Sequence, residues 1–185
     1  MRFTHGVIMA EKKGFIIVNT GDGKGKTTAA LGTALRACGH GMRVLVLQFI
    51  KGTWHYGELD AAKRLAPELE IVPMGEGFVD PARKPPDPRD TAAAEKCFAR
   101  FEQAAASGKY DIIILDEIGY ALNYGLLQVE KVVTLLKRKP AALHVILTGR
   151  DMPKELVEIA DTVTEMKEIK HVFRKGVKGI KGIEF

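Results

Sequence analysis

One nine-residue segment of the chain combines glycines, lysines and threonines at a spacing that suits phosphate binding. The segment is Thr20-Gly21-Asp22-Gly23-Lys24-Gly25-Lys26-Thr27-Thr28. Glycines let backbone N–H groups converge on an anion without a clash from Cβ, and a following helix adds the partial positive charge of its N-terminus. In such loops the last lysine reaches the outer phosphates and the next hydroxyl ligates Mg²⁺. The segment therefore predicts a nucleoside triphosphate site, with Lys26 on the phosphates and Thr27 on the metal.

The loop departs from the usual phosphate-loop pattern at its first position, because counting back from Gly25 places Thr20 where the first glycine belongs. Gly21 and Gly23 keep the turn flexible, so we expect phosphate binding along an altered path. Lys24 is a second cation inside the loop, which would suit a triphosphate that leaves as one unit. A Lys24 that points to solvent is the alternative, and for the whole loop the alternative is a ligand-free turn.

Two acidic residues follow an apolar run that ends at Leu115. Asp116 and Glu117 resemble the second element of a phosphate-loop site, in which a carboxylate helps to hold Mg²⁺ directly or through water. A glutamate at this place can also position an attacking water. From these motifs alone, nucleotide hydrolysis or phosphoryl transfer by a small P-loop ATPase or kinase is the first hypothesis. The alternative is a buried strand that simply ends in acids at its solvent edge.

Two loop segments add aromatic and cationic side chains. In Gln48-Phe49-Ile50-Lys51-Gly52-Thr53-Trp54 we expect Phe49 in the core, whereas Trp54, the only tryptophan, is in a polar loop and suits contact with a flat ligand. Phe78 is between flexible positions in Gly75-Glu76-Gly77-Phe78. For Phe78 a place in the core is the alternative to a ligand contact.

Alternating strands and helices must position these residues. Strands are predicted at 15–18, 43–49, 70–74, 110–117, 143–148 and 162–166, and Pro73 favours an edge position or a strand end for the third. The first helix, 29–38, is expected to bury a stripe of Leu31, Ala34, Leu35 and Cys38. Further helices are expected after Asp90 as N-cap, from Val129 until before Pro140, and after Pro153. Residues 75–89, with four prolines, are expected to form a loop.

Near-continuous apolar strands separated by helices indicate an α/β protein with a mainly parallel central sheet covered on both faces. With the phosphate loop after the first strand, we predict a P-loop NTPase-like (RecA-like) three-layer sandwich. Ligands of such sheets bind at the carboxyl ends of the strands. The segments 21–28, 48–52, 116–117 and 148–150 should therefore share one site.

The length, net charge and cysteine content of the chain limit the classes of function that it can have. Its 185 residues suit one domain, predicted at 14–185, after a short N-terminal arm at 1–13. The net charge of +5 comes from 28 Lys and Arg against 23 Asp and Glu, and the basic residues of the tail are dispersed, which favours a solvated surface over a nucleic-acid site. A nucleic-acid-binding module remains the third hypothesis. Two cysteines without metal-ligand spacing, and no run of membrane-spanning length, predict a cytoplasmic protein with free thiols.

An ordered series of motifs resembles a known family. The phosphate loop, Gln48 to Trp54, Gly77-Phe78 and Leu115-Asp116-Glu117-Ile118 are followed by the segments 148–150, 160–165, 169–171 and 182–184. In that order the motifs resemble the ATP:cob(I)alamin (corrinoid) adenosyltransferases of cobalamin biosynthesis and salvage, over residues 14–185. A phosphate loop alone is common to many families, whereas the complete series is specific.

The resemblance implies a reaction other than hydrolysis. Reduced Co(I) of a corrinoid such as cobalamin or cob(I)yrinic acid a,c-diamide attacks the 5′-carbon of ATP and expels triphosphate, and the loop holds ATP in the reverse of the usual direction. It implies catalytic roles for Lys24, Lys26 and Phe78, and Mg²⁺ (or Mn²⁺) on Thr27, Glu117 and Asp116. The implied contacts to ATP or corrinoid are Thr20, Gly21, Asp22, Gly23, Lys24, Gly25, Lys26, Thr27, Thr28, Arg36, Lys51, Trp54 and Phe78.

The resemblance also bears on the corrinoid and on partners. Phe78 matches an aromatic residue that displaces the lower axial ligand of the cobalt, but Asp80 stands where well-described members carry a tryptophan. The preferred corrinoid and the lower-face mechanism are therefore open. Family members are often homodimers, and we expect a homodimer with a reduced N-terminal lid, an electron-donating flavoprotein reductase, and no nucleic-acid or membrane partner.

Overall fold

The computed structural model describes residues 13–52 and 54–184, so the predicted arm at 1–13 falls almost entirely outside the described residues. Strands and helices alternate along the described chain. The strands are β1 (Ile16–Thr20), β2 (Val44–Gln48), β3 (Leu69–Pro73), β4 (Ile112–Asp116), β5 (His144–Thr148) and β6 (Thr162–Glu165). The helices are α1 (Lys26–Cys38), α2 (Gly57–Arg64), α3 (Pro88–Ala106), α4 (Ile118–Asn123), α5 (Val129–Arg138), α6 (Lys154–Ile159) and the short 3₁₀ helix η1 (Val172–Lys175).

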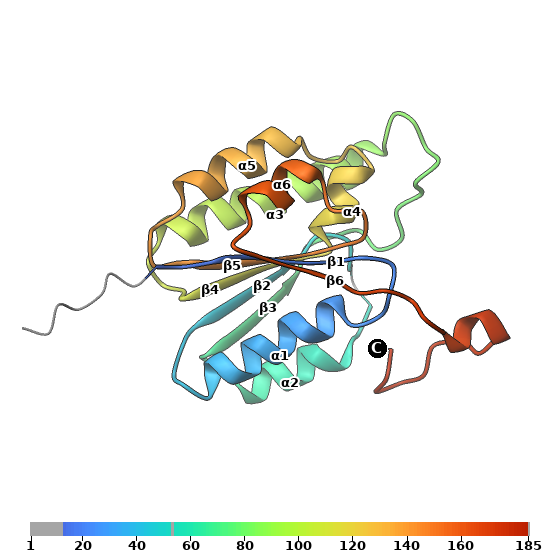
Figure 1. Ribbon diagram of the computed structural model, residues 1–185, viewed down its shortest axis with the longest axis horizontal. Coiled ribbons are helices and arrows are strands. Elements are labelled where there is room, and N and C mark those ends of the chain that lie inside the picture. The colour runs from blue at the N-terminus through green and yellow to red at the C-terminus, as the bar shows by residue number, and fades with distance from the viewer. Residues whose placement is uncertain (1–12, 53, 185) are drawn as a thin grey trace, which may run out of the picture.

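The strands form one sheet in the order β3-β2-β4-β5-β1-β6, and each neighbouring pair is parallel. Parallel neighbours need a crossover connection, which explains why helices separate the strands. Figure 1 shows α1 and α2 against one face of the sheet and α3, α4, α5 and α6 against the other. The predicted three-layer α/β sandwich with a parallel sheet is confirmed, and β3 lies at an edge, as Pro73 predicted.

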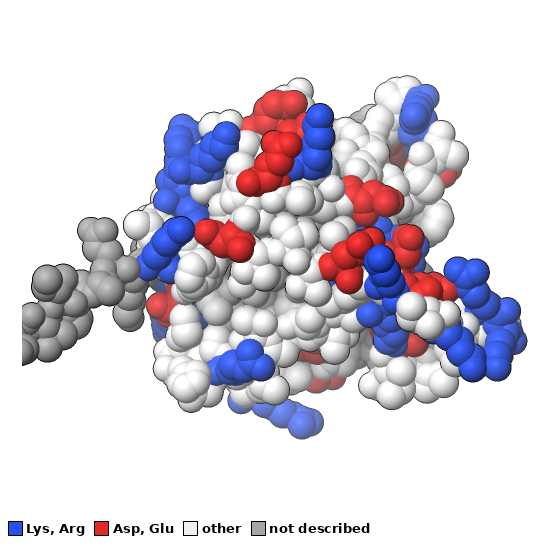
Figure 2. All heavy atoms as spheres, viewed as in Figure 1, with Lys and Arg blue, Asp and Glu red and all other residues white. Residues whose placement is uncertain are grey.

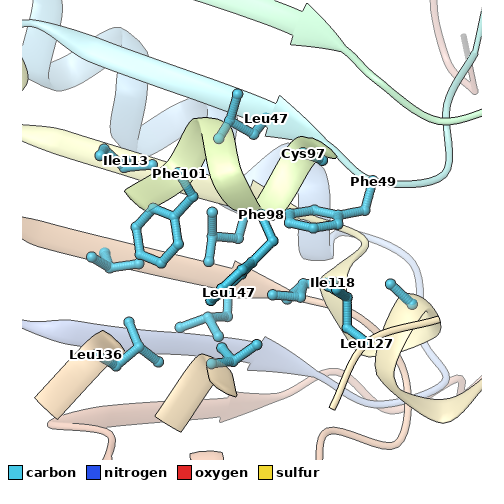
Figure 3. Packing of buried hydrophobic residues seen from close by; sticks show 14 of the residues in the cluster. Leu47, Phe49, Cys97, Phe98, Phe101, Ile113, Ile118, Leu127, Leu136 and Leu147 are labelled. Carbon is cyan, nitrogen blue, oxygen red and sulfur yellow. The ribbon is translucent and has the colours of Figure 1, made fainter. Parts of the chain in front are cut away.

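The larger part of the core lies between the sheet and helices α3 to α6. Phe98 and Phe101 of α3 pack with Phe49, Ile113 and Leu147 from the strand side, as Figure 3 shows. Phe49 is buried, as predicted. The apolar stripe of α3 is buried, and its members are Ala94, Cys97, Phe98, Phe101 and Ala105. This core fixes the strands whose carboxyl ends carry the polar segments.

The buried stripe of α1 differs from the predicted one. The buried positions are Ala30, Ala34 and Ala37, whereas Leu35 is 59% exposed and Leu31 is only half-buried. The prediction is right for Ala34 and for Leu31 and Cys38, which pack half-buried against the core, and it is wrong for Leu35. Three alanines let α1 approach the sheet closely, and this close packing outweighs the preference of the larger leucine for burial.

Two further local predictions need correction. Helix α3 begins at Pro88 rather than after Asp90, because Asp87 is the N-cap and its Oδ1 accepts a hydrogen bond from the Arg89 N–H at 2.9 Å. Proline at the first helical position needs no N–H partner there. The expected loop therefore ends two residues early. Helices α2 and α4 were not predicted, because each is short and adjoins a polar segment.

Basic and acidic residues both occur on the face seen in Figure 2. Lys and Arg side chains gather near the C-terminal tail and, on the opposite side, near the end of α5, with acidic side chains between them. On this face the charge pattern is mixed. Among the described residues, no helix has the length and apolar character needed to span a membrane.

Candidate active site

Asp116, at the carboxyl end of β4, connects three of the predicted segments. Its Oδ1 accepts hydrogen bonds from Thr27 Oγ1 at 2.7 Å and from Thr148 Oγ1 at 2.8 Å. Its Oδ2 accepts one from Gln48 Nε2 at 3.2 Å. Asp116 is fully buried, so these donors replace the water that a carboxylate otherwise needs. The predicted convergence of strand ends at one site is confirmed.

The phosphate loop packs tightly against the end of β6. Gly21 and Gly25 have φ values of 93° and 118°, which side-chain-bearing residues rarely adopt. A Cβ on Gly21 would also lie 2.5 Å from the Met166 carbonyl oxygen, so glycine is required there for space as well. The loop therefore enters α1 with its backbone held close to the chain that follows β6.

Lys26 begins α1, and its ammonium is directed back into the loop. Its Nζ donates hydrogen bonds to the carbonyl oxygens of Gly21 at 2.7 Å and Gly23 at 2.6 Å. Partial burial and the nearby Arg150 guanidinium both lower the pKa of Lys26, whereas Asp22 opposes this shift. The lysine that the sequence predicts on the outer phosphates is thus held inside the loop that would bind them.

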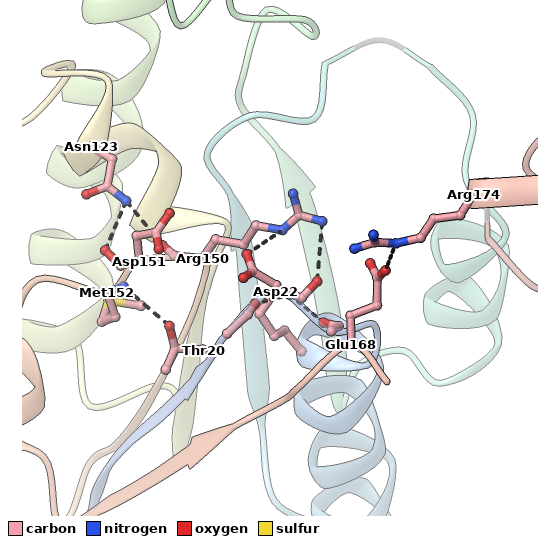
Figure 4. Close-up of polar contacts among 11 residues, drawn as sticks. Thr20, Asp22, Asn123, Arg150, Asp151, Met152, Glu168 and Arg174 are labelled. Atoms are coloured by element: carbon pink, nitrogen blue, oxygen red, sulfur yellow. Dashed lines mark hydrogen bonds and ion pairs between the residues drawn. The ribbon is translucent and has the colours of Figure 1, made fainter. Parts of the chain in front are cut away.

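Thr20, where the loop departs from the usual pattern, contacts the segment after β5. Its Oγ1 accepts a hydrogen bond from the Met152 N–H at 3.3 Å, as Figure 4 shows. From the same segment, Arg150 Nη2 donates to the Asp22 carbonyl oxygen at 3.4 Å, and its Nε lies 4.0 Å from Asp22 Oδ1. The threonine thus helps to anchor the loop on the β5 side, a role that a glycine cannot fill.

Lys24 contacts the C-terminal tail. Its Nζ donates a hydrogen bond to the Ile183 carbonyl oxygen at 2.9 Å and forms an ion pair with Glu184 at 2.5 Å. Lys24 is therefore held by the tail, although its side chain remains 40% exposed. Glu184 was part of a sequence motif, but no role was predicted for it, since nothing local relates it to a loop 160 positions earlier.

Glu117 lies half-buried beside the loop. It adopts a left-handed backbone conformation with φ of 62°, and its N–H donates to Thr148 Oγ1 at 2.8 Å. Its carboxyl Oε2 has no hydrogen-bond partner within the described protein. Burial, with Asp116 as a second cause, raises the pKa of Glu117 to about 7. A buried oxygen without a donor suits a cation or a bound water.

Lys51 and Glu58 form an ion pair that the sequence did not predict. Lys51 Nζ donates to Glu58 Oε1 at 2.8 Å, and it lies 3.6 Å from Asp116 Oδ2 and 4.8 Å from the centre of the Tyr56 ring. Burial alone would lower the pKa of Lys51, but Asp116 and Glu58 outweigh it and raise the value. Glu58 was missed because helix α2, which carries it, was not predicted.

A cavity of about 530 Å³ brings these parts together. It is bounded by the loop, by α2 and by the tail, and its lining includes Lys26, Thr27, Lys51, Glu58 and Glu117. A second cavity, of about 550 Å³, opens on the other side of the loop. Three predicted groups, the loop lysines, Lys51 and Glu117, therefore face a single space that can hold a polyphosphate.

The aromatic residues lie outside this cavity. Trp54 is 69% exposed and borders a separate hollow beside β3 and Gly75, and Phe78 is 85% exposed and borders another with Asp80. A place in the core, the alternative considered for Phe78, is excluded. Trp54 and Phe78 follow β2 and β3, so they lie toward the same edge of the sheet as the loop.

Arg36 is the predicted contact that the structure does not bring to the loop. It is exposed in the last turn of α1, ten residues after Lys26. At 1.5 Å rise per residue its Cα is roughly 15 Å along the helix. Arg36 lines none of the cavities described above.

A parallel α/β sheet with a glycine- and lysine-rich loop after β1 and a carboxylate at the end of β4 defines a P-loop nucleotide-binding protein. In fold it is similar to the flagellar accessory protein FlaH from Methanocaldococcus jannaschii. That match has a TM-score of 0.55 and 16% identity and covers 83% of this chain and 71% of the other. Residues 12–185 match the family described as ATP:corrinoid adenosyltransferase BtuR/CobO/CobP, and the chain belongs to this family.

Curated relatives agree with this assignment. A corrinoid adenosyltransferase of Sinorhizobium sp. is 44% identical, over 96% of this chain and 85% of its own length. The corrinoid adenosyltransferase of Escherichia coli K12 and corrinoid adenosyltransferase CobA of Salmonella typhimurium LT2 are each 41% identical, over 95% of this chain and 87% of their own lengths. The similarity therefore covers nearly the whole chain and not the loop alone.

Proposed function

We propose that this chain transfers the 5′-deoxyadenosyl group of ATP to reduced cobalt, Co(I), of a corrinoid and releases inorganic triphosphate. The family match over residues 12–185 carries the proposal, and relatives named corrinoid adenosyltransferase that span most of the chain support it. The site is consistent with it, since cationic side chains and the N-terminus of α1 face one cavity large enough for a triphosphate.

The reaction forms one bond and breaks one. The electron pair of Co(I) forms the Co–C bond at the 5′-carbon, and the C5′–O bond breaks with its electron pair on triphosphate. Because the substrate brings its own nucleophile, the protein needs no general base. We assign to Lys24, Lys26 and the N-terminus of α1 the stabilisation of charge on the leaving triphosphate, and to residues 20–28 its alignment.

The oxygen donors beside the loop fit a divalent cation. Thr27 Oγ1, Asp116 and the unpartnered Oε2 of Glu117 are hard oxygen ligands of the kind that Mg²⁺ and Mn²⁺ prefer. We propose that these three residues hold such an ion, directly or through water. When bound, the ion would neutralise part of the triphosphate charge.

We propose that the corrinoid lies on the side where Trp54 and Phe78 are exposed. A corrin macrocycle is flat and largely apolar, so exposed aromatic rings suit its face. Phe78 is assigned to the lower face, where it would displace the axial ligand and make Co(II) easier to reduce. Asp80, two residues later, accepts a hydrogen bond from the Ala82 N–H at 2.9 Å and so shapes the loop next to Phe78.

We further propose a homodimer that receives electrons from a flavoprotein reductase in the cytoplasm. Exposed apolar tail residues, such as Ile169 and Phe173, support burial against a partner. Both cysteines are free thiols, with Cys97 buried and Cys38 half-buried, which is typical of a reducing compartment. Light scattering should give twice the mass of one chain, and a monomer would contradict the dimer.

One experiment tests the activity directly. The protein is mixed anaerobically with Mg-ATP and chemically reduced cob(I)alamin, the visible spectrum is recorded and the phosphate products are separated. We expect light-sensitive adenosylcobalamin and one triphosphate per Co–C bond. Inorganic phosphate without a Co–C bond would instead indicate a small P-loop ATPase or kinase.

A further inference from the structure

Glu58 is the side chain that holds Lys51 at the wall of the phosphate-loop cavity. The Lys51 side chain is 16% exposed and the Glu58 side chain is 17% exposed, so the pair is largely shielded from water. The 2.8 Å distance from Lys51 Nζ to Glu58 Oε1 is that of a charge-assisted hydrogen bond. Neither residue belongs to the phosphate loop, yet both line its cavity together with Lys26 and Thr27.

Asp116 also attracts Lys51, but it cannot take the place of Glu58. The Lys51 Nζ to Asp116 Oδ2 distance is 3.6 Å, which is outside hydrogen-bond range. The oxygens of Asp116 already accept from Thr27, Thr148 and Gln48. Without Glu58, the ammonium would be drawn toward the buried Asp116 carboxylate and away from the open part of the cavity.

We propose that Glu58 is a positioning residue that sets Lys51 as a third cation of the triphosphate site, beside Lys24 and Lys26. This inference rests on the proposed function, since it takes triphosphate as the ligand of the cavity. Lys51 comes from the chain after β2 and Glu58 from α2, so this cation reaches the cavity from a different segment than the two loop lysines. Glu58 acts through Lys51 and needs no contact with the ligand.

A double-mutant cycle on the full chain separates this role from a purely structural one. Binding of inorganic triphosphate and of Mg-ATP is measured by calorimetry for the wild type, Glu58→Gln, Lys51→Gln and the double variant. We expect Glu58→Gln to weaken binding about tenfold, because a charged hydrogen bond that fixes Lys51 is lost. In the Lys51→Gln background the same change should strengthen binding, because it then removes only a repelling carboxylate.

Two further variants control for folding. Asp60→Asn removes one acidic charge from the solvent side of the same helix, where Asp60 pairs with His55 and Lys63, and it should leave binding unchanged. Glu58→Asp keeps the charge and should recover part of the lost affinity. Equal melting temperatures across the set would show that α2 is intact.

The proposal is overturned if Glu58→Gln binds triphosphate as well as the wild type does, or loses the same affinity in both Lys51 backgrounds. It is equally overturned if Asp60→Asn loses as much affinity as Glu58→Gln. A failure of the proposed adenosyl transfer would give a different set of results from a failure of the proposed role of Glu58. In that case no Co–C bond forms from cob(I)alamin, while the sign reversal of the binding cycle is still observed.

Discussion

The phosphate-loop side and the aromatic side of the site differ in how their side chains are held. On the loop side, Asp116 is fully buried with three donors, and Lys26 is bonded to its own loop. On the aromatic side, Trp54 and Phe78 are mostly exposed. The first region is therefore organised before any ligand arrives, whereas the second has apolar surface that only a ligand or a partner can cover.

The difference between the two sides predicts that ATP affinity depends on residues of the loop side. Lys26→Ala should reduce ATP affinity and adenosyl transfer by at least about a hundredfold, because the change removes a cation that we propose stabilises the triphosphate. Calorimetry and the spectroscopic assay measure the two effects. Lys137→Ala, at an exposed position of α5, is the matched control. An unfolded Lys26→Ala protein, judged by circular dichroism, would assign Lys26 a structural role instead.

The buried carboxyl of the loop side should make stability depend on pH. The pKa of Glu117 is about 7 in the folded protein, above its ordinary value of 4.5, so folding favours the protonated form. Its contribution is fully present below pH 4.5 and is lost as the pH rises through about 7, by about 3 kcal/mol in total.

The measurement is the free energy of unfolding in urea for wild type and Glu117→Gln between pH 4.5 and 8. Since Gln does not titrate, we expect the wild type to lose stability relative to the variant as pH rises. Parallel curves for the two proteins would mean that the carboxyl is not desolvated as the structure indicates.

The aromatic side should act on the corrinoid alone. Phe78→Ala should leave ATP affinity unchanged but slow turnover from Co(II) corrinoid about tenfold more than turnover from pre-reduced Co(I), because the lower axial ligand would no longer be displaced. Leu35→Ala, an exposed apolar residue of α1, is the control. An equal loss of turnover with Co(II) and with Co(I) corrinoid would refute the lower-face role of Phe78. The aromatic side would then not differ from the loop side in the way proposed.

The smallest expected effect concerns the tail, which borders the loop side. Glu184→Gln frees Lys24 from its ion pair and should strengthen triphosphate binding about two- to threefold, since a partly exposed pair contributes little. In a Lys24→Gln background the gain should be smaller, because the change then removes only the repulsion between the Glu184 carboxylate and the ligand. Weaker binding by Glu184→Gln alone would mean that the tail carboxylate supports the ligand rather than competing with it.

The two regions also differ in how far the sequence predicted them. The loop, the acidic pair at the end of β4 and the succession of strands and helices along the chain follow from contiguous patterns, because strand, turn and helix preferences are local. The α1 stripe was wrong at Leu35, and the N-cap of α3 was wrong by three residues. Those positions were decided by close packing of alanines against the sheet and by a capping bond from Asp87.

The sequence by itself determined the α/β class, the phosphate loop with Lys26 and Thr27, and the family resemblance that the comparisons confirm. Only the tertiary structure decided which distant groups meet the loop. Thr27 and Asp116 are 89 positions apart, and Lys24 and Ile183 are 159 apart. Such contacts depend on strand order, crossovers and the path of the tail, none of which is encoded in residues that are neighbours in the chain. For the same reason the pairing of Glu58 with Lys51 became visible only once α2 was placed beside the cavity.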